Sequence, residues 1–193
     1  WSHALFKSLL FMGAGSIFHA GGTLEMSRLG GLMRRMPFTG ALMIVGAAAV
    51  SALPPLNGFV SELPVYLSLI HAGQTADGGQ AFLFMLSAIL LAMVGGMVVL
   101  TMTRLIGIVF AGSPRSRASE NAREVAMPMI AAMLLNACLC FGFGIFPQFV
   151  VLLLDNPYAV LSPGSPSLTA VLQLPFGTGW SIGALLLTGI VAV

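Results

Sequence analysis

The chain has 193 residues, of which 58% are hydrophobic and 7% are charged, and its formal net charge is +2. A soluble domain needs roughly a quarter of its residues charged, so this composition excludes one and indicates a membrane protein whose surface faces lipid or other apolar helices. The small net charge, without a basic groove interleaved with aromatic residues, excludes nucleic acid as a partner.

Five apolar stretches predict an all-α fold, a polytopic transmembrane helix bundle, because each crossing needs about 20 apolar residues. The stretches do not alternate between apolar and polar residues, so strands are not expected. They lie at about 2–20, 37–72, 81–111, 125–154 and from 177 onward. We divide the chain into residues 1–154, the main transmembrane helices, and residues 155–193, a loop plus the start of a further transmembrane helix. Both ends of the chain fall inside helical patterns, so we expect the C-terminal part of a longer multi-span protein.

Lys7 lies inside the first apolar stretch. A charge at the centre of a bilayer costs about 2.5–3.5 kcal/mol on insertion scales, so such a residue is paired, hydrated or used. His3 lies four residues earlier and shares a helix face with Lys7, so the two can pass a proton along a hydrated path, with water ordered by Ser8 and Ser16. The alternative is that Lys7 extends to the membrane surface from a terminal turn.

The second stretch is too long for one straight crossing, and its prolines predict a broken helix. Pro54 and Pro55 have no backbone N–H, and Asn57 and Gly58 are good turn residues. Pro64 removes a further donor. Backbone groups freed in this way cannot face lipid, and discontinuous helices recur at ion and substrate sites of transporters.

Glu62 lies beside this predicted break. A proline kink without a functional role is common in membrane helices, but a carboxylate next to the kink favours a site. The break, a buried carboxylate and nearby water together suit a group that takes up and releases a proton. We therefore predict a proton relay through His3, Lys7 and Glu62.

No catalytic residues, metal site or cofactor site are predicted. Cys138 and Cys140 are two residues apart on a probable helix, so their side chains point apart and they are expected to be packing residues. His19 lies about 24 Å from His3 along a helix axis, and His71 lies near a loop, so ligands at matched depth for a haem are not evident. There is no cysteine motif for an iron–sulfur cluster. Whether the chain belongs to an enzyme therefore depends on other subunits.

The basic residues are distributed asymmetrically between the loops. The loop between the first two stretches contains Arg28, Arg34 and Arg35, and the loop between the third and fourth contains Arg115, Arg117 and Arg123. The loops near 74–80 and 155–176 contain no arginine or lysine. If the second stretch crosses once, both arginine loops share a side, and the positive-inside rule places that side in the cytoplasm of a bacterium.

The motifs of the chain resemble a known superfamily. HALFKSLLFMGAGS, GGLMRRMP and ALPPLNGFVSE, in this order, are similar to segments of the antiporter-like membrane subunits of respiratory complex I and of multisubunit sodium/proton antiporters. NGFVSE followed by RLIGIVFAGSPRS resembles the branch that contains formate hydrogenlyase subunit 3 and hydrogenase-4 component B. The resemblance covers about residues 1–154.

The resemblance implies a proton-translocating subunit with charged residues buried at mid-membrane, and it assigns His3, Lys7 and Glu62 to that pathway. We expect a multi-pass protein of the bacterial inner membrane, in contact with lipid, other membrane subunits and redox subunits of the hydrogenase or quinone oxidoreductase type. One alternative is a subunit of a cation/proton antiporter without a redox partner. The other is a membrane anchor that does not conduct protons, in which a fixed partner neutralises Glu62.

Overall fold

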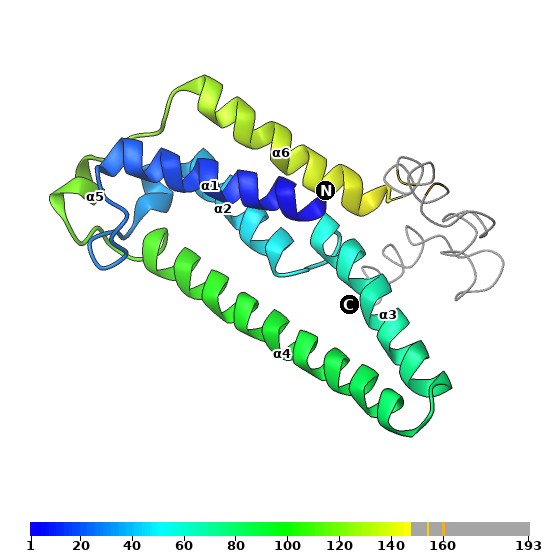
Figure 1. Cartoon of the computed structure of the whole chain (residues 1–193). Coiled ribbons are helices and arrows are strands. Elements are labelled where there is room, and N and C mark those ends of the chain that lie inside the picture. Colours follow the sequence, from blue (N-terminus) through cyan, green and yellow to red (C-terminus); the bar gives the residue numbers. More distant parts are fainter. Residues whose placement is uncertain (148–153, 155–159, 161–193) are drawn as a thin grey trace.

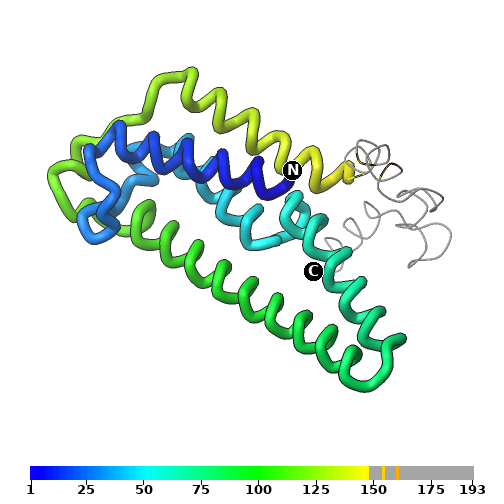
Figure 2. Tube along the Cα trace, in the orientation of Figure 1, coloured from blue at the N-terminus to red at the C-terminus, as the bar shows by residue number. Residues whose placement is uncertain are grey.

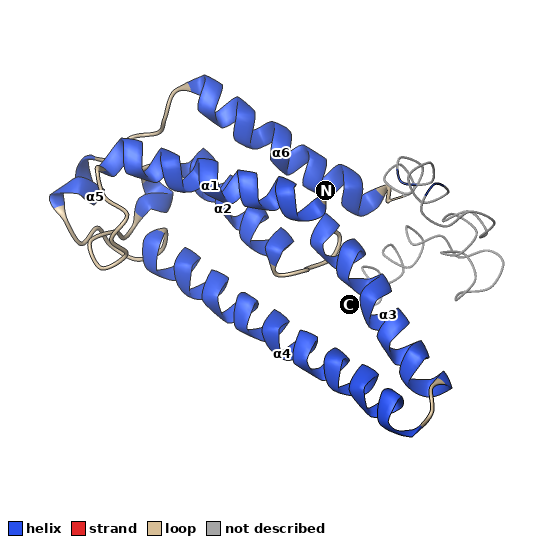
Figure 3. Ribbon diagram, viewed as in Figure 1, coloured by secondary structure: helices blue, strands red, loops and turns tan. Residues whose placement is uncertain are grey.

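The computed structural model describes residues 1–147, 154 and 160, and the regular elements of this part are all helical (Figures 1 and 3). The long helices are α1 (Ser2–Gly21), α2 (Pro37–Val50), α3 (Asn57–Thr75), α4 (Gly78–Val109) and α6 (Met127–Ile145), and the short ones are η1 (Leu32–Arg34) and α5 (Arg117–Asn121). α1, α4 and α6 are each long and apolar enough to cross a membrane. The all-α transmembrane bundle is therefore confirmed.

The helices begin and end where the local sequence favours it. α1 ends at Gly21 and is capped by Gly22, which has a positive φ of 67° and donates its N–H to the carbonyl of Phe18 at 2.7 Å. α2 starts with Pro37, whose fixed φ suits a first helical position and whose missing N–H has no partner to lose there. α5 is capped by Ser116, whose hydroxyl accepts the N–H of Ser119 at 3.3 Å.

α1, α2 and α6 pack together into the main core, while α3 and α4 form a long hairpin beside it (Figure 2). The core centres on fully buried side chains from different helices and loops, including Leu9, Met36, Phe110 and Met133. At Gly13 of α1 the neighbouring helix approaches so closely that an added Cβ would meet the side chain of Met43. The core thus lies on the α1–α2–α6 side of the protein.

α4 is the least covered helix. Its most apolar window of 18 residues contains no buried residue. Only its C-terminal end enters the core, through Val109 and the following Phe110, which are 3% and 1% exposed. Arg104 lies just before this end and is exposed.

The two arginine loops lie side by side, as predicted from the charge distribution. The N–H of Gly31 donates to the carbonyl of Ala111 at 2.9 Å, and the hydroxyls of Ser116 and Ser119 donate to the carbonyl of Arg28 at 2.8 and 2.9 Å. Gly31 has a positive φ of 65° and packs directly on Pro114. We call this end of the bundle, formed by residues 22–36 and 110–126, the arginine end.

The remaining apolar stretches agree with the structure to different extents. The stretch at 37–72 forms two helices, α2 and α3, which together connect the arginine end to the α3–α4 turn (Figure 1). The stretch at 125–154 forms α6, which ends at Ile145. The expected helix from 177 onward and the division at residue 155 fall outside the described residues.

Candidate functional site: the junction at the broken helix

The helix break lies at residues 51–56, between the end of α2 and the start of α3. Pro54 and Pro55 are inside it, and Ala52 has a positive φ of 52°. Gly58 lies in the first turn of α3, so it is a helical residue beside the break and not part of it.

Pro64, expected to contribute to the break, lies inside α3, which continues through it to Thr75. A proline inside a helix removes one backbone donor and leaves the carbonyl four residues earlier, here that of Val60, without its helical partner. The other bonds of the helix persist, and the hydroxyl of Ser68 donates to the carbonyl of Pro64 at 2.7 Å. Pro64 therefore frees one carbonyl close to Glu62 without ending the helix.

Two glycines allow the backbones around the break to touch. A Cβ on Gly58 would collide with the carbonyl oxygen of Ala49 on α2. A Cβ on Gly144 of α6 would collide with the carbonyl oxygen of Pro55 and would lie 2.8 Å from the carbonyl carbon of Leu56. α2, α3 and α6 thus meet at the break through their main chains. We call this meeting point, together with the start of α1, the junction.

At the junction, Asn57 links the start of α3 to the start of α1. It is the first residue of α3, is 1% exposed, and its Nδ2 donates to the carbonyl of Ser2 at 3.3 Å. Its Oδ1 is buried and has no hydrogen-bond partner among the described residues. A buried acceptor left without a donor costs about 1–3 kcal/mol. The sequence placed Asn57 in a turn and did not indicate this contact.

Two titratable residues of α1, His3 and Lys7, lie in its first two turns, on the junction side of the helix. The ring of His3 packs edge-on against the ring of Phe6 with 5.2 Å between centroids, and Nζ of Lys7 lies 5.6 Å from the ring centroid of Phe11. The His3 and Lys7 side chains are exposed in this structure. Ser16, in contrast, is fully buried and donates to the carbonyl of Met12 at 2.9 Å, which indicates a packing residue.

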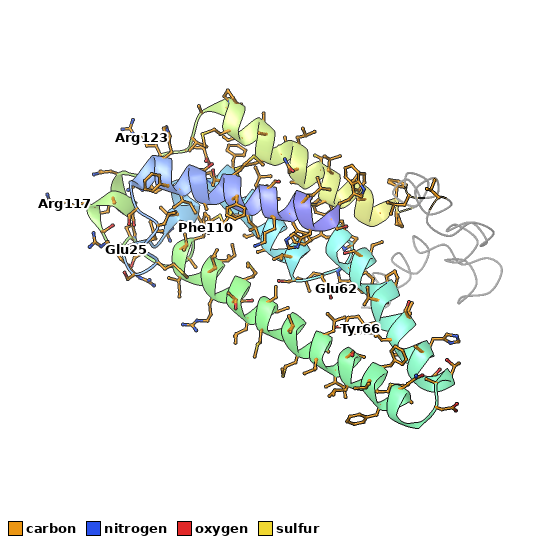
Figure 4. All side chains as sticks on the ribbon, in the orientation of Figure 1. Glu25, Glu62, Tyr66, Phe110, Arg117 and Arg123 are labelled. Carbon is orange, nitrogen blue, oxygen red and sulfur yellow. The ribbon has the colours of Figure 1, made fainter. Side chains whose placement is uncertain are left out.

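Glu62 lies in the second turn of α3 and is half-buried. Tyr66, four residues later, follows it on the same face of the helix, and Figure 4 shows both side chains. Among the residues that the structure describes, neither Glu62 nor Lys7 forms an ion pair; the one ion pair there joins Arg28 and Glu25 at 2.6 Å.

Lys7 and Glu62 lie on opposite sides of the junction. α1 and α3 run from it toward opposite ends of the bundle (Figure 1). Lys7 is five residues from Ser2 and Glu62 is five residues from Asn57, which is about 7.5 Å along each helix axis. The structure thus connects the two helices through Asn57 and does not bring the two charged side chains into direct contact.

Glu124 forms a second polar cluster, which the sequence did not reveal. Its Oε2 accepts the backbone N–H groups of Phe38 and Thr39 at 2.9 and 3.4 Å, and its Oε1 accepts the hydroxyl of the fully buried Thr39. Glu124 precedes α6, so it caps the N-terminus of α2 from a segment that is 85 residues away in sequence. A carboxylate suits this position because the N-terminus of a helix presents unpaired N–H groups and a partial positive charge.

Within residues 1–147, 154 and 160, no group of three or more His, Cys, Asp or Glu residues is arranged to hold a metal ion. Cys138 is exposed and Cys140 is fully buried on α6.

These features define an integral membrane helix bundle with one proline-broken helix and titratable residues on both sides of the break. Residues 1–90 match the family model described as "NADH:quinone oxidoreductase/Mrp antiporter, TM". The chain belongs to this family.

Named relatives agree with this assignment. Hydrogenase-4 component B of Escherichia coli (strain K12) is 43% identical over 139 residues, which is 72% of this chain and 21% of the relative. Formate hydrogenlyase subunit 3 of the same organism is 35% identical over 172 residues, which is 89% of this chain and 28% of the relative. Na(+)/H(+) antiporter subunit A1 of Staphylococcus haemolyticus is 28% identical over 200 residues, which is 96% of this chain and 24% of the relative. The chain thus spans between 21% and 28% of the length of these relatives.

Proposed function

We propose that the chain is part of a proton-translocating membrane subunit of a redox-driven complex, and that His3, Lys7 and Glu62 carry protons through it. The observation that supports this most is the junction, where Asn57 ties the helix of His3 and Lys7 to the helix of Glu62. The two relatives from Escherichia coli are named as parts of a hydrogenase and of a formate hydrogenlyase. They favour a hydrogenase-type redox partner and the bacterial inner membrane.

In this proposal the residues act in sequence. Glu62 takes up a proton on the α3 side, where the carbonyl of Val60 lacks its helical partner because of Pro64 and can hold water. Lys7 and His3 exchange protons on the α1 side. Because Lys7 and Glu62 diverge from the junction, a proton has to cross between them through water. The redox reaction itself belongs to other subunits, which drive the direction of transfer.

The first alternative is a subunit of a cation/proton antiporter without a redox partner. The name of the staphylococcal relative favours it, and the same three residues would serve. The subunits that co-purify with the full protein distinguish the two: hydrogenase or quinone oxidoreductase subunits support the main proposal, and antiporter subunits alone support the alternative.

The second alternative is an anchor in which a fixed cation neutralises Glu62. Glu62 has no ion-pair partner in the part of the chain that the structure describes, which favours a carrier over an anchor. In an anchor, removing one member of a buried pair leaves an unpaired charge and costs about 3–5 kcal/mol, so assembly of the complex would fail.

Replacing Glu62 tests the proposal in the full-length protein within its complex. Glu62→Gln keeps the shape of the side chain and removes its titration, so proton flux should fall while the yield of complex stays normal. Glu120→Gln is the matched control, because Glu120 is an exposed carboxylate at the arginine end. Lost yield for Glu62→Gln would support the anchor, and normal flux at normal yield would refute any role of Glu62 as a proton carrier.

A further inference from the structure

We infer that Asn57 holds a water molecule at the junction, and that this water connects the proton carriers of α1 with Glu62 on α3. The inference rests on the proposed function and adds a residue and a solvent site to it. It starts from the buried Oδ1 of Asn57, which has no donor among the residues described here.

The orientation of the amide is fixed by its other contact. Only the nitrogen of an asparagine side chain can donate, so the bond from Nδ2 to the carbonyl of Ser2 at 3.3 Å assigns the two ends of the amide. Oδ1 therefore faces away from Ser2 and can only accept. Backbone contacts at Gly58 and Gly144 hold the main chain around Asn57, so the side chain, at 1% exposure, cannot turn its oxygen toward bulk solvent.

The start of α3 offers backbone N–H groups as hydrogen-bond donors to a water molecule. The residue before the helix, Leu56, has no side-chain acceptor, and no side chain caps the first turn. The first N–H groups of a helix have no partner within the helix. A water that donates to Oδ1 of Asn57 can accept from such an N–H group, and buried waters are stable where about two to four polar partners surround them.

This position lies between the two carriers. Lys7 and Glu62 are each about 7.5 Å along their helices from the residues that the Asn57 bond joins, and His3 directly follows Ser2. Because a hydrogen bond spans only about 3 Å, further water molecules on each side carry the proton between this water and the carriers. The water at Oδ1 accepts a proton from its water neighbour on one side while one of its own O–H protons passes to its water neighbour on the other side. The water is restored, and the amide of Asn57 keeps its protons throughout.

Two substitutions separate a water-holding role from a purely structural one, in the full-length protein within its complex. Asn57→Leu fills the space and removes the acceptor, so proton flux per assembled complex should fall about tenfold, equivalent to about 1.4 kcal/mol in the barrier. Asn57→Ser supplies a shorter polar group and room for additional water, so its flux should stay within about threefold of the original. Asn136→Leu is the matched control, because the one side-chain hydrogen bond of Asn136 among the described residues stays within its own helix, to the carbonyl of Ala132 at 3.0 Å.

The same experiment states what would overturn the inference. The inference is wrong if Asn57→Leu has the same proton flux as Asn136→Leu. It is also wrong if Asn57→Leu and Asn57→Ser assemble normally and lose proton flux to the same extent. If Asn57→Leu does not assemble, Asn57→Ser decides: near-normal flux supports the water, and failure to assemble shows a structural residue. A density map of the complex adds an independent result, because a water within about 3.2 Å of Oδ1 supports the inference and a protein donor there refutes it.

The outcome for Glu62 keeps the two proposals distinct. If Glu62→Gln abolishes flux while Asn57→Leu does not, the relay stands and the water at Asn57 is wrong. If Glu62→Gln has normal flux, the proposed function itself fails.

Discussion

The close contact at Gly144 allows a sharp test of the junction. Gly144→Ala introduces a Cβ that collides with the carbonyl oxygen of Pro55 and lies 2.8 Å from the carbonyl carbon of Leu56 and 2.9 Å from the N atom of Asn57. These obstacles are backbone atoms, which cannot turn aside as the end of a side chain can. Overpacking costs about 1–3 kcal/mol, and we expect the upper part of this range.

Gly142 provides the control on the same helix. A Cβ there meets no atom within 4 Å, and alanine is about 0.5–1 kcal/mol better than glycine inside a helix. Gly142→Ala should therefore be slightly stabilising. Both glycines lie inside α6, so the gain from alanine applies to both variants and cancels. We therefore expect the two variants to differ by about 2–3 kcal/mol in the free energy of unfolding, which is the cost of overpacking at Gly144.

The measurement is reversible unfolding of the purified protein in mixed micelles, followed by circular dichroism as the denaturing detergent is increased. Gly144→Ala should unfold at a clearly lower fraction of denaturing detergent than Gly142→Ala. Equal stability of the two variants would show that α6 does not pack closely against the backbone of the break, and the reasoning about the junction would then be wrong.

Three further predictions follow from other contacts. Glu124→Ala removes the cap of α2 and should lower the free energy of unfolding by about 2–3 kcal/mol. The same detergent titration measures this change, and the control Glu120→Ala should change the free energy of unfolding by less than about 0.5 kcal/mol. Lys7→Ala should reduce proton flux with assembly intact, and Lys7→Arg should not restore it because arginine stays protonated; normal flux in both variants would show that Lys7 only extends to the surface. A reporter fused after Arg117 should be cytoplasmic and one fused at Gly78 periplasmic, and finding both on one side would contradict a single crossing by α2 and α3.

The sequence predicted the helices and the break because these depend on local chemistry. The apolar stretches gave α1, α4 and α6 in the right order, and Pro54 and Pro55 located the interruption between α2 and α3. The arginine-rich segments were correctly expected at one end, since charge is excluded from the hydrocarbon region. Pro64, predicted as part of the break, lies inside α3, because the rest of a helix can hold when one hydrogen bond is missing.

The contacts that build the junction could not be predicted in the same way. The approach of Gly144 to Pro55 and the bond from Asn57 to Ser2 join segments far apart in the sequence, and nothing in the local pattern of either segment marks the other. Glu124 is a similar case, because a glutamate in a loop gives no sign that it caps a distant helix. The candidate relay residues could be proposed from the sequence because charge is rare in apolar stretches, because His3 shares a helix face with Lys7, and because their motifs resemble those of a known family.

The length of α4 has a consequence for how the protein fits its bilayer. Between Ala81 and Thr103 the helix extends for about 33 Å, slightly more than the typical hydrocarbon thickness of about 30 Å. Its end beyond Arg104 is fixed, since Phe110 is buried and its carbonyl accepts the N–H of Met33 at 3.0 Å. In a thinner membrane α4 must therefore tilt about Phe110, and this tilt moves the α3–α4 turn. Hydrophobic mismatch would thus displace the C-terminal end of α3, the helix that carries Glu62.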